Sequence, residues 1–246
     1  MKSAWTILLA AMAATTAPAF AGVNLVQNGS FETNGGNGQL AFNTSVTDWS
    51  VPALNGSYWF LYAPGTADTT GSNGQYGNVA LWGPGNGSAN GLPATSPDGG
   101  YFLASDPSFQ SGALTQTITG LKAGKAYEVS FDWAAAQQFG FTGPTFEGWD
   151  VSLGSSMQST GTVNIPSHGF QGWMTQTFDF TATSSSETLS FLAIGGPNGS
   201  VPPFALLDGV SLTAVPESST WAMMLLGFAG LSYAGFRSRR TAISIA

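Results

Sequence analysis

The 246-residue chain contains no cysteine, one histidine and only six lysine and arginine residues. Without cysteine there is no disulfide framework, thiolate nucleophile or cysteine-based zinc site. A single histidine also excludes a site built from several histidines. Six basic residues are too few for the clustered positive charge that nucleic-acid binding requires, so we expect no nucleic-acid partner.

The chain is rich in aromatic side chains, which make up 13% of its residues, and it has thirteen acidic residues. This aromatic content argues against intrinsic disorder, and the length suits one domain or a small pair. The charges are unevenly divided: residues 22–214 hold two lysines and twelve acids, a net charge of −10. The chain is therefore an acidic body between two apolar ends that carry most of the basic residues.

Residues 1–21 have the pattern of a secretory signal peptide. Lys2 precedes an apolar run over residues 4–14, and Ala19-Phe20-Ala21 supplies a small-residue cleavage site. The alternative is a buried N-terminal helix, which Pro18 and this small-residue exit disfavour. No twin-arginine motif is present, so we expect export through Sec.

Residues 215–241 form a second targeting pattern. The run 221–236 has 16 residues without a charge, and an arginine cluster follows it. This order predicts a single transmembrane helix with the arginines in the cytoplasm and the body outside. A core helix would show a polar stripe, which this run lacks. A glycolipid anchor would need a polar spacer where Trp221 already stands.

The same segment resembles a PEP-CTERM sorting signal of the PEPxxWA type. The matching residues are Val215, Pro216, Glu217, Trp221, Ala222, Met223, Met224, Arg237, Arg239 and Arg240. Ser218 stands where the second proline is usual, a departure that bears on how efficiently the signal is processed. The resemblance implies processing by a membrane-embedded exosortase in a Gram-negative bacterium that makes exopolysaccharide. The protein would be held briefly in the inner membrane and then reach the periplasm, cell surface or exterior.

Residues 22–214 show the two-residue periodicity of β-strands. Tyr127, Val129, Phe131 and Trp133 alternate with polar residues, which predicts a half-buried strand. Similar runs predict strands over 24–31, 101–104, 114–118, 149–153, 171–182, 188–194 and 205–213. Eight Asn-Gly pairs mark turns, and six lie from residue 34 to residue 90, where we expect long loops around residues 58–62. The fold class is therefore all-β, a sandwich or jelly roll.

The body resembles galactose-binding-like jelly rolls, the fold of many carbohydrate-binding modules. The resemblance lies in the opening residues 24–32 and the closing residues 206–212. It implies that the first and last strands lie side by side. It also implies a structural calcium ion held by Glu32 and Asp208, although no cofactor is required. Calcium takes six to eight oxygen ligands, and the alternative is that both acids are ordinary turn residues.

No catalytic motif stands out in the sequence. A glycosidase needs two carboxylates about 5–10 Å apart, and Glu147 and Asp150, the nearest such acids, are interpreted as solvated residues beside a core tryptophan. His168 lies in a loop-like segment, and no G-x-S-x-G motif occurs, which disfavours a serine triad.

Aromatic residues are the better functional lead, because ring faces stack on sugars while nearby polar groups bind hydroxyls. Trp133, Trp149 and Trp173 are expected in the core, whereas Trp59, Tyr76 and Trp82 are candidates for a glycan platform. The first hypothesis is thus a non-enzymatic exported protein, structural or glycan-binding, with exopolysaccharide as a candidate partner. The alternatives are a secreted polysaccharide or ester hydrolase and a protein-binding scaffold.

Overall fold

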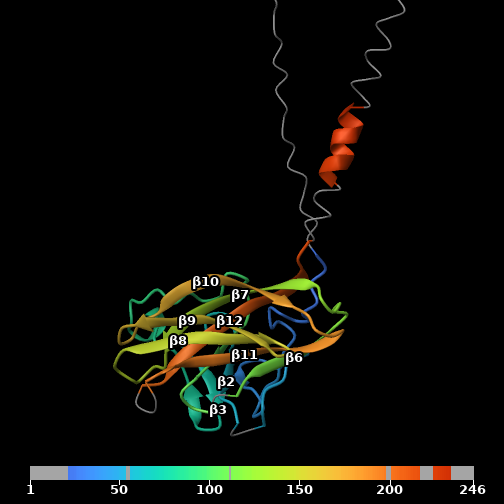
Figure 1. Ribbon diagram of the computed structural model, residues 1–246. Coiled ribbons are helices and arrows are strands. Elements are labelled where there is room, and N and C mark those ends of the chain that lie inside the picture. Colours follow the sequence, from blue (N-terminus) through green and yellow to red (C-terminus); the bar gives the residue numbers. More distant parts are fainter. Residues whose placement is uncertain (1–21, 54–55, 111, 198–200, 217–223, 234–246) are drawn as a thin grey trace, which may run out of the picture.

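The computed structural model describes residues 22–53, 56–110, 112–197, 201–216 and 224–233 (Figure 1). The signal-peptide segment and most of the sorting motif, including Glu217, Trp221 and the three arginines, lie outside the described residues. The elements in chain order are β1 (Gly38–Gln39), β2 (Trp59–Tyr62), β3 (Ser72–Gly74), β4 (Gly77–Val79), the 3₁₀ turn η1 (Pro84–Asn86), β5 (Phe102–Ser105), β6 (Leu114–Thr119), β7 (Ala126–Gln137), β8 (Thr145–Leu153), β9 (Ser156–Ile165), β10 (Gln171–Thr181), β11 (Ser186–Gly196) and β12 (Pro203–Ala214).

The strands form a sandwich of two antiparallel sheets, which confirms the all-β prediction. One sheet has the order β1-β2-β5-β12-β7-β10, and the other has the order β6-β11-β8-β9. A separate two-stranded ribbon joins β3 to β4. β12 occupies the middle of the larger sheet because it pairs with β5 on one side and β7 on the other.

The predicted opening strand over residues 24–31 is not a strand in the structure. The segment does run beside β12, where the Leu25 amide donates to the Leu212 carbonyl at 2.9 Å and the Val210 amide donates to the Gly29 carbonyl at 2.9 Å. Turn residues interrupt it, since Asn28 and Phe31 both adopt positive φ angles, 50° and 58°. These turns break the ladder that a continuous strand would need.

The main core fills the space between the two sheets. The four apolar residues that alternate along β7 are all buried there, as their spacing predicts. Trp59 and Trp149 meet across this core with ring centroids 5.4 Å apart. Trp133 and Trp149 are core residues as expected, while Trp173 packs against a different cluster.

A second cluster, here called the outer core, covers the opposite face of the six-stranded sheet. Residues 63–100, which include much of the region 34–90 where we expected long loops, fold over that face and carry β3, β4 and η1. The run 58–62, around which we expected these loops, is buried, and β2 occupies residues 59–62 of it. Trp59 and Leu61 enter the main core, and Phe60 and Tyr62 enter the outer core. A strand buried on both faces has a continuous apolar sequence without alternation. The outer core comprises Tyr58, Phe60, Tyr62, Ala67, Val79, Leu81, Leu92, Phe102, Ala104, Ala134, Ala136, Phe204 and Leu206.

Both ends of the body lie at the same place. An added Cβ on Gly22 would fall 3.4 Å from the Ala214 carbonyl oxygen, and Figure 1 shows the first and last coloured segments meeting there. Residues 224–233 are helical and expose apolar side chains such as Leu225 and Leu231. Among the described residues, no helix is both long and apolar enough to span a bilayer. The predicted run 221–236 extends beyond the described helix at both ends.

Candidate functional site

The strand register gathers four chain segments at one end of the larger sheet. Trp59 at the start of β2 pairs with Ser105 at the end of β5, and Pro203 at the start of β12 pairs with Gln137 at the end of β7. The residues just beyond these strand ends therefore come together, although they are far apart in sequence. They are Tyr58, Asp106, Gln138 and Pro202, and all four line one pocket.

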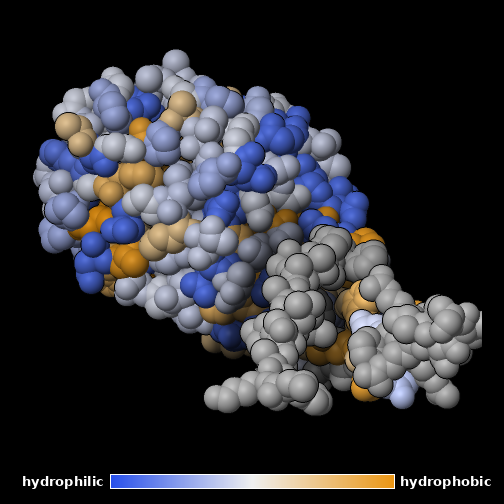
Figure 2. All heavy atoms as spheres, turned by 90° about the horizontal axis from the view of Figure 1, so that it is seen from above, coloured by the Kyte–Doolittle hydropathy of each residue, from blue (hydrophilic) through white to orange (hydrophobic). Residues whose placement is uncertain are grey.

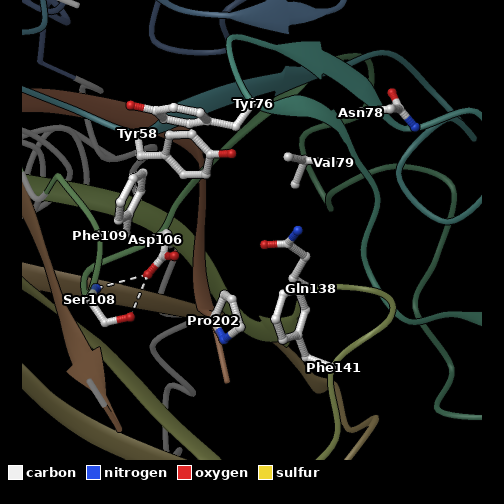
Figure 3. A pocket seen from close by; sticks show the side chains of 10 residues that line it. All are labelled: Tyr58, Tyr76, Asn78, Val79, Asp106, Ser108, Phe109, Gln138, Phe141 and Pro202. Atoms are coloured by element: carbon white, nitrogen blue, oxygen red, sulfur yellow. Dashed lines mark hydrogen bonds between the residues drawn. The ribbon is translucent and has the colours of Figure 1, made fainter. Parts of the chain in front are cut away.

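This pocket has a volume of about 340 Å³. Its lining comes from the sheet ends, the β3–β4 ribbon, the turn after β5 and the β7–β8 loop. Figure 3 shows Tyr58, Tyr76 and Phe109 on one side, with Gln138, Pro202 and Phe141 facing them across the cavity. The complete lining is Tyr58, Tyr76, Asn78, Val79, Asp106, Ser108, Phe109, Gln138, Phe141 and Pro202.

Three aromatic rings pack into one wall of the pocket. The Tyr58 and Phe109 centroids are 5.1 Å apart with perpendicular rings, and those of Tyr76 and Phe109 are 5.6 Å apart. Tyr76 remains 62% exposed and Phe109 42% exposed, so part of each ring is accessible to a ligand. Edge-to-face packing fixes the ring orientations before anything binds.

Asp106 is the acid that lines this pocket. Its Oδ1 accepts hydrogen bonds from the Ser108 amide at 2.8 Å and the Ser108 hydroxyl at 2.9 Å. Burial nevertheless raises the pKa of Asp106 to about 6, because these bonds only partly offset desolvation. Burial, the Asp106 charge and Tyr76 together raise the pKa of Tyr58 to about 12, so its phenol stays neutral.

A second acid, Glu147, lies behind Asp106 between the two sheets. Its side chain is fully buried, and neither carboxyl oxygen has a hydrogen-bond partner. Burial raises the pKa of Glu147 to about 9, and the Asp106 charge adds to this rise. The Thr145 hydroxyl offsets a small part of it, although its geometry falls short of a hydrogen bond. The prediction that Glu147 is solvated is therefore wrong, because it belongs to the inward face of β8.

The three predicted platform residues have different positions. Tyr76 lies on the pocket as an exposed ring. Trp59 is wrong as a platform residue: it is fully buried in the main core, where its indole N–H donates to the Gly112 carbonyl at 2.7 Å. Trp82 is partly buried and stacks on His168 with centroids 3.8 Å apart. His168 is a loop residue with a φ of 61°, as expected from its sequence context.

The acids predicted to hold calcium lie at a separate place, beside the N-terminal segment. Asp208 is fully buried, and its Oδ2 accepts a bond from the Ser96 hydroxyl while its Oδ1 has no partner. Burial raises the pKa of Asp208 to about 8, with smaller upward contributions from the charges of Asp98 and Glu32. Glu32 Oε1 accepts the Tyr101 amide at 2.6 Å.

The carboxyl oxygens of Glu32 and Asp208 could supply some of the ligands that a hard cation needs. The enclosed, unpartnered Asp208 Oδ1 is the kind of oxygen that an ion satisfies. In the described parts of the chain, however, no three side chains of the aspartate, glutamate, histidine or cysteine type converge to hold a metal ion. Backbone carbonyls or water would have to complete the coordination of an ion bound by Glu32 and Asp208.

Sequence reasoning missed Asp106, Phe109 and Gln138 as site residues. Asp106 and Phe109 lie just after a short strand that the pattern did predict, and Gln138 follows the end of β7. The sequence signal that could have indicated them is a turn directly after a strand that contains a carboxylate and an aromatic residue together with Pro and Ser. Their convergence with Pro202 depends on cross-strand register, which the sequence does not reveal.

No protein-family model matches the chain. Halomucin of Haloquadratum walsbyi is 30% identical over 185 residues, and the match covers 72% of this chain and 2% of halomucin. The chain thus spans a very small part of that relative's length.

Several solved structures resemble the chain at low sequence identity. A CBM4 module is 20% identical with a TM-score of 0.35, covering 77% of this chain and 99% of that one. The CBM22-1 xylan-binding domain of Paenibacillus barcinonensis Xyn10C is 12% identical with a TM-score of 0.40, covering 81% and 99% of the two chains. The K1 cleaved adhesin domain of Lys-gingipain from Porphyromonas gingivalis is 14% identical with a TM-score of 0.39, covering 74% and 100%.

Proposed function

We propose that the protein is a non-catalytic, glycan-binding component of the bacterial exterior and that the pocket at the β2, β5, β7 and β12 ends is its binding site. The observation that carries this proposal is the combination of exposed, pre-oriented rings with a few polar groups. Tyr76 and Phe109 offer apolar faces to a sugar ring, and Asp106 and Gln138 supply acceptors and donors for its hydroxyls. The volume lies at the lower end of the roughly 300–1,000 Å³ typical of small-ligand sites, which suits one or two sugar units.

The pocket is a poor fit for a glycoside hydrolase. Hydrolysis needs two carboxylates that both reach the sugar, and Asp106 is the sole acid among the ten lining residues. The charge of Asp106 affects the pKa of Glu147, but Glu147 is fully buried and cannot contact a sugar in the pocket. We therefore favour binding without catalysis.

The position of the pocket also fits a protein sorted through its C-terminus. The body ends at Ala214, while the pocket lies at Pro202, at the other end of the 12-residue strand β12. At about 3.3 Å per residue the two ends are roughly 35 Å apart. If an exosortase acts on residues 215–241, the binding site points away from the attachment end. In this proposal the protein is exported through Sec, held briefly by the C-terminal segment and then displayed or released.

Calcium at Glu32 and Asp208 is proposed as a structural addition rather than as part of the binding site. When bound, the ion would supply positive charge to the enclosed Asp208 carboxylate and tie the N-terminal segment to β12. The segment already bonds to β12 through Leu25 and Gly29. Such an ion would stabilise the fold without contacting a ligand in the pocket.

A protein-binding scaffold is the remaining alternative. A scaffold of that kind is expected to carry a broad apolar patch. In Figure 2, seen from above, the coloured residues show apolar side chains in small groups among hydrophilic ones. This view gives no specific support to the scaffold alternative.

The test is a glycan array probed with the full-length protein and with a Tyr76→Ala/Phe109→Ala double variant. We expect binding to one or more saccharides by the wild type and its loss in the double variant. Phe42→Ala is the matched control, because Phe42 is 46% exposed and does not line the pocket. Equal glycan binding by wild type and double variant would refute the assignment of the site.

A further inference from the structure

Asp106 places a carboxyl at the pocket end of the sandwich, and within the described ranges no lysine or arginine lies beside it. Asp106 lines the cavity, and Glu147 lies close enough behind it for the two carboxyls to interact. The lysines of the described residues, Lys122 and Lys125, lie in the turn before β7, whereas the pocket lies just after β7 ends. Twelve residues of strand, roughly 35 Å, separate them from the site. No described lysine or arginine therefore neutralises Asp106.

The free side of Asp106 faces the cavity. Its Oδ1 is engaged by the amide and hydroxyl of Ser108. In Figure 3 the second carboxyl oxygen lies on the side away from Ser108, toward the space enclosed by Pro202 and Gln138. A ligand that enters the pocket would meet the Asp106 carboxyl in its lining, where the residue is only 3% exposed to solvent.

The aromatic wall, like Asp106, favours a positively charged ligand. Ring faces carry negative potential and attract cations, and the attraction grows where water is excluded. Tyr58, Tyr76 and Phe109 form the wall on the Asp106 side of the cavity. The Tyr58 phenol stays neutral and adds no charge to this wall, because its pKa is raised to about 12.

These features together narrow the ligand class. An anionic sugar, such as a uronic acid or a sulfated unit, would meet Asp106 without a compensating cation. A bare metal ion would find one lining carboxylate and mostly apolar walls, too few oxygens for its coordination. A sugar with a protonated amine satisfies both the ring faces and the carboxylate.

We propose that the pocket selects saccharides bearing an unacetylated amino group, with the ammonium against Asp106 and the sugar ring against Tyr76 and Phe109. This inference rests on the proposed glycan-binding function and specifies its substrate class. A β-1,4-linked glucosamine trisaccharide is the corresponding probe, and its N-acetylated counterpart is the neutral comparison.

The test is isothermal titration calorimetry on the full-length protein at pH 7 and 150 mM NaCl. We expect the amine trisaccharide to bind at least tenfold more tightly than the acetylated one. Asp106→Asn should remove this preference while leaving the affinity for the acetylated trisaccharide within about threefold. Glu128→Gln is the charge-matched control, because Glu128 is exposed near the start of β7, far from the pocket, and it should keep the preference.

A pH comparison on the wild type provides a second route if Asp106→Asn does not fold. The pKa of Asp106 is raised to about 6, so lowering the pH from 7 to 5 should reduce the fraction of protein with an ionised Asp106 about tenfold. The affinity for the amine should fall with that fraction. The sugar amine is at least as protonated at pH 5 as at pH 7, and Tyr58 and Glu147, whose pKa values are raised to about 12 and about 9, stay neutral in this range. The acetylated sugar should change much less.

The outcomes separate the two proposals. Equal affinity for both trisaccharides, or an unchanged preference in Asp106→Asn, would overturn the amine selectivity while leaving glycan binding intact. If Glu128→Gln lost the preference for the amine trisaccharide as fully as Asp106→Asn, the amine would be attracted by the overall negative charge of the body. That result would also overturn the amine selectivity of the pocket. Failure of every saccharide on the array and in the calorimeter would overturn the proposed function as well.

Discussion

Glu147→Gln should change how the stability of the protein depends on pH. Glu147 is fully buried, and its pKa is raised to about 9 by burial. Below pH 4.5 the group is protonated in both the folded and unfolded states. Between pH 4.5 and 9 the unfolded chain releases the proton and the folded chain keeps it. The stabilising contribution is therefore complete at acid pH and is lost as the pH rises toward 9.

The size of this effect follows from proton linkage. Each pH unit between the two pKa values changes the free energy of unfolding by up to about 1.4 kcal/mol for one proton. From pH 5 to pH 8 the wild type should therefore lose up to about 4 kcal/mol through Glu147. Glutamine has nearly the same shape and no proton to release, so the variant should be close to the wild type at pH 5 and more stable at pH 8.

Urea denaturation followed by tryptophan fluorescence, at half-unit pH steps, measures this directly. The control is Glu128→Gln, an exposed acid whose variant should give a curve parallel to that of the wild type. If Glu147→Gln also gave a parallel curve, Glu147 would not be a buried neutral acid, and our account of the space between the sheets would be wrong. Asp106 and Asp208 have raised pKa values too, so some decline with pH should persist in the variant.

Three further predictions follow from the other parts of the molecule. Single Tyr76→Ala and Phe109→Ala variants should each weaken glycan binding about tenfold in calorimetry, because truncating an aromatic contact costs about 1–2 kcal/mol. Their melting temperatures should stay unchanged. A lower melting temperature with unchanged binding would instead indicate a structural role. Trp59→Ala should instead lower the free energy of unfolding by about 3–5 kcal/mol, as measured by urea denaturation, because it empties a fully buried site; a stable variant with lost binding would contradict this. Calcium at a hundredfold excess over its dissociation constant should raise the melting temperature of the wild type by an amount corresponding to about 3 kcal/mol. Asp208→Asn should abolish this response, and the variant should melt no lower than the wild type does in chelator. If neither calcium nor chelator changed the melting curve of the wild type, the protein would have no structural calcium site.

The strands of the body could be predicted wherever one face is buried and the other is wet. β7 is the clearest case, since its alternating apolar residues all enter the main core. β9 escaped prediction because it is exposed along most of its length and has no apolar face to reveal. β2 also lacks alternation, for the opposite reason, since cores lie on both of its faces.

The site was only partly predictable. Tyr76 could be proposed from its weak strand context, and it does lie on the pocket. Trp59 has the same chemistry and a similar context, yet the neighbouring strands bury it completely. The pairing of Asp106 with Glu147 joins residues 41 positions apart through sheet packing, and such long-range proximity leaves no trace in a single sequence.

A crystal structure of the protein with the saccharide that binds best on the array would show directly whether the pocket at the β2, β5, β7 and β12 ends is the binding site. The account predicts a sugar ring against Tyr76 and Phe109, with a polar group of the sugar bonded to Asp106 or Gln138. A sugar bound elsewhere on the sandwich, with this pocket empty, would contradict it.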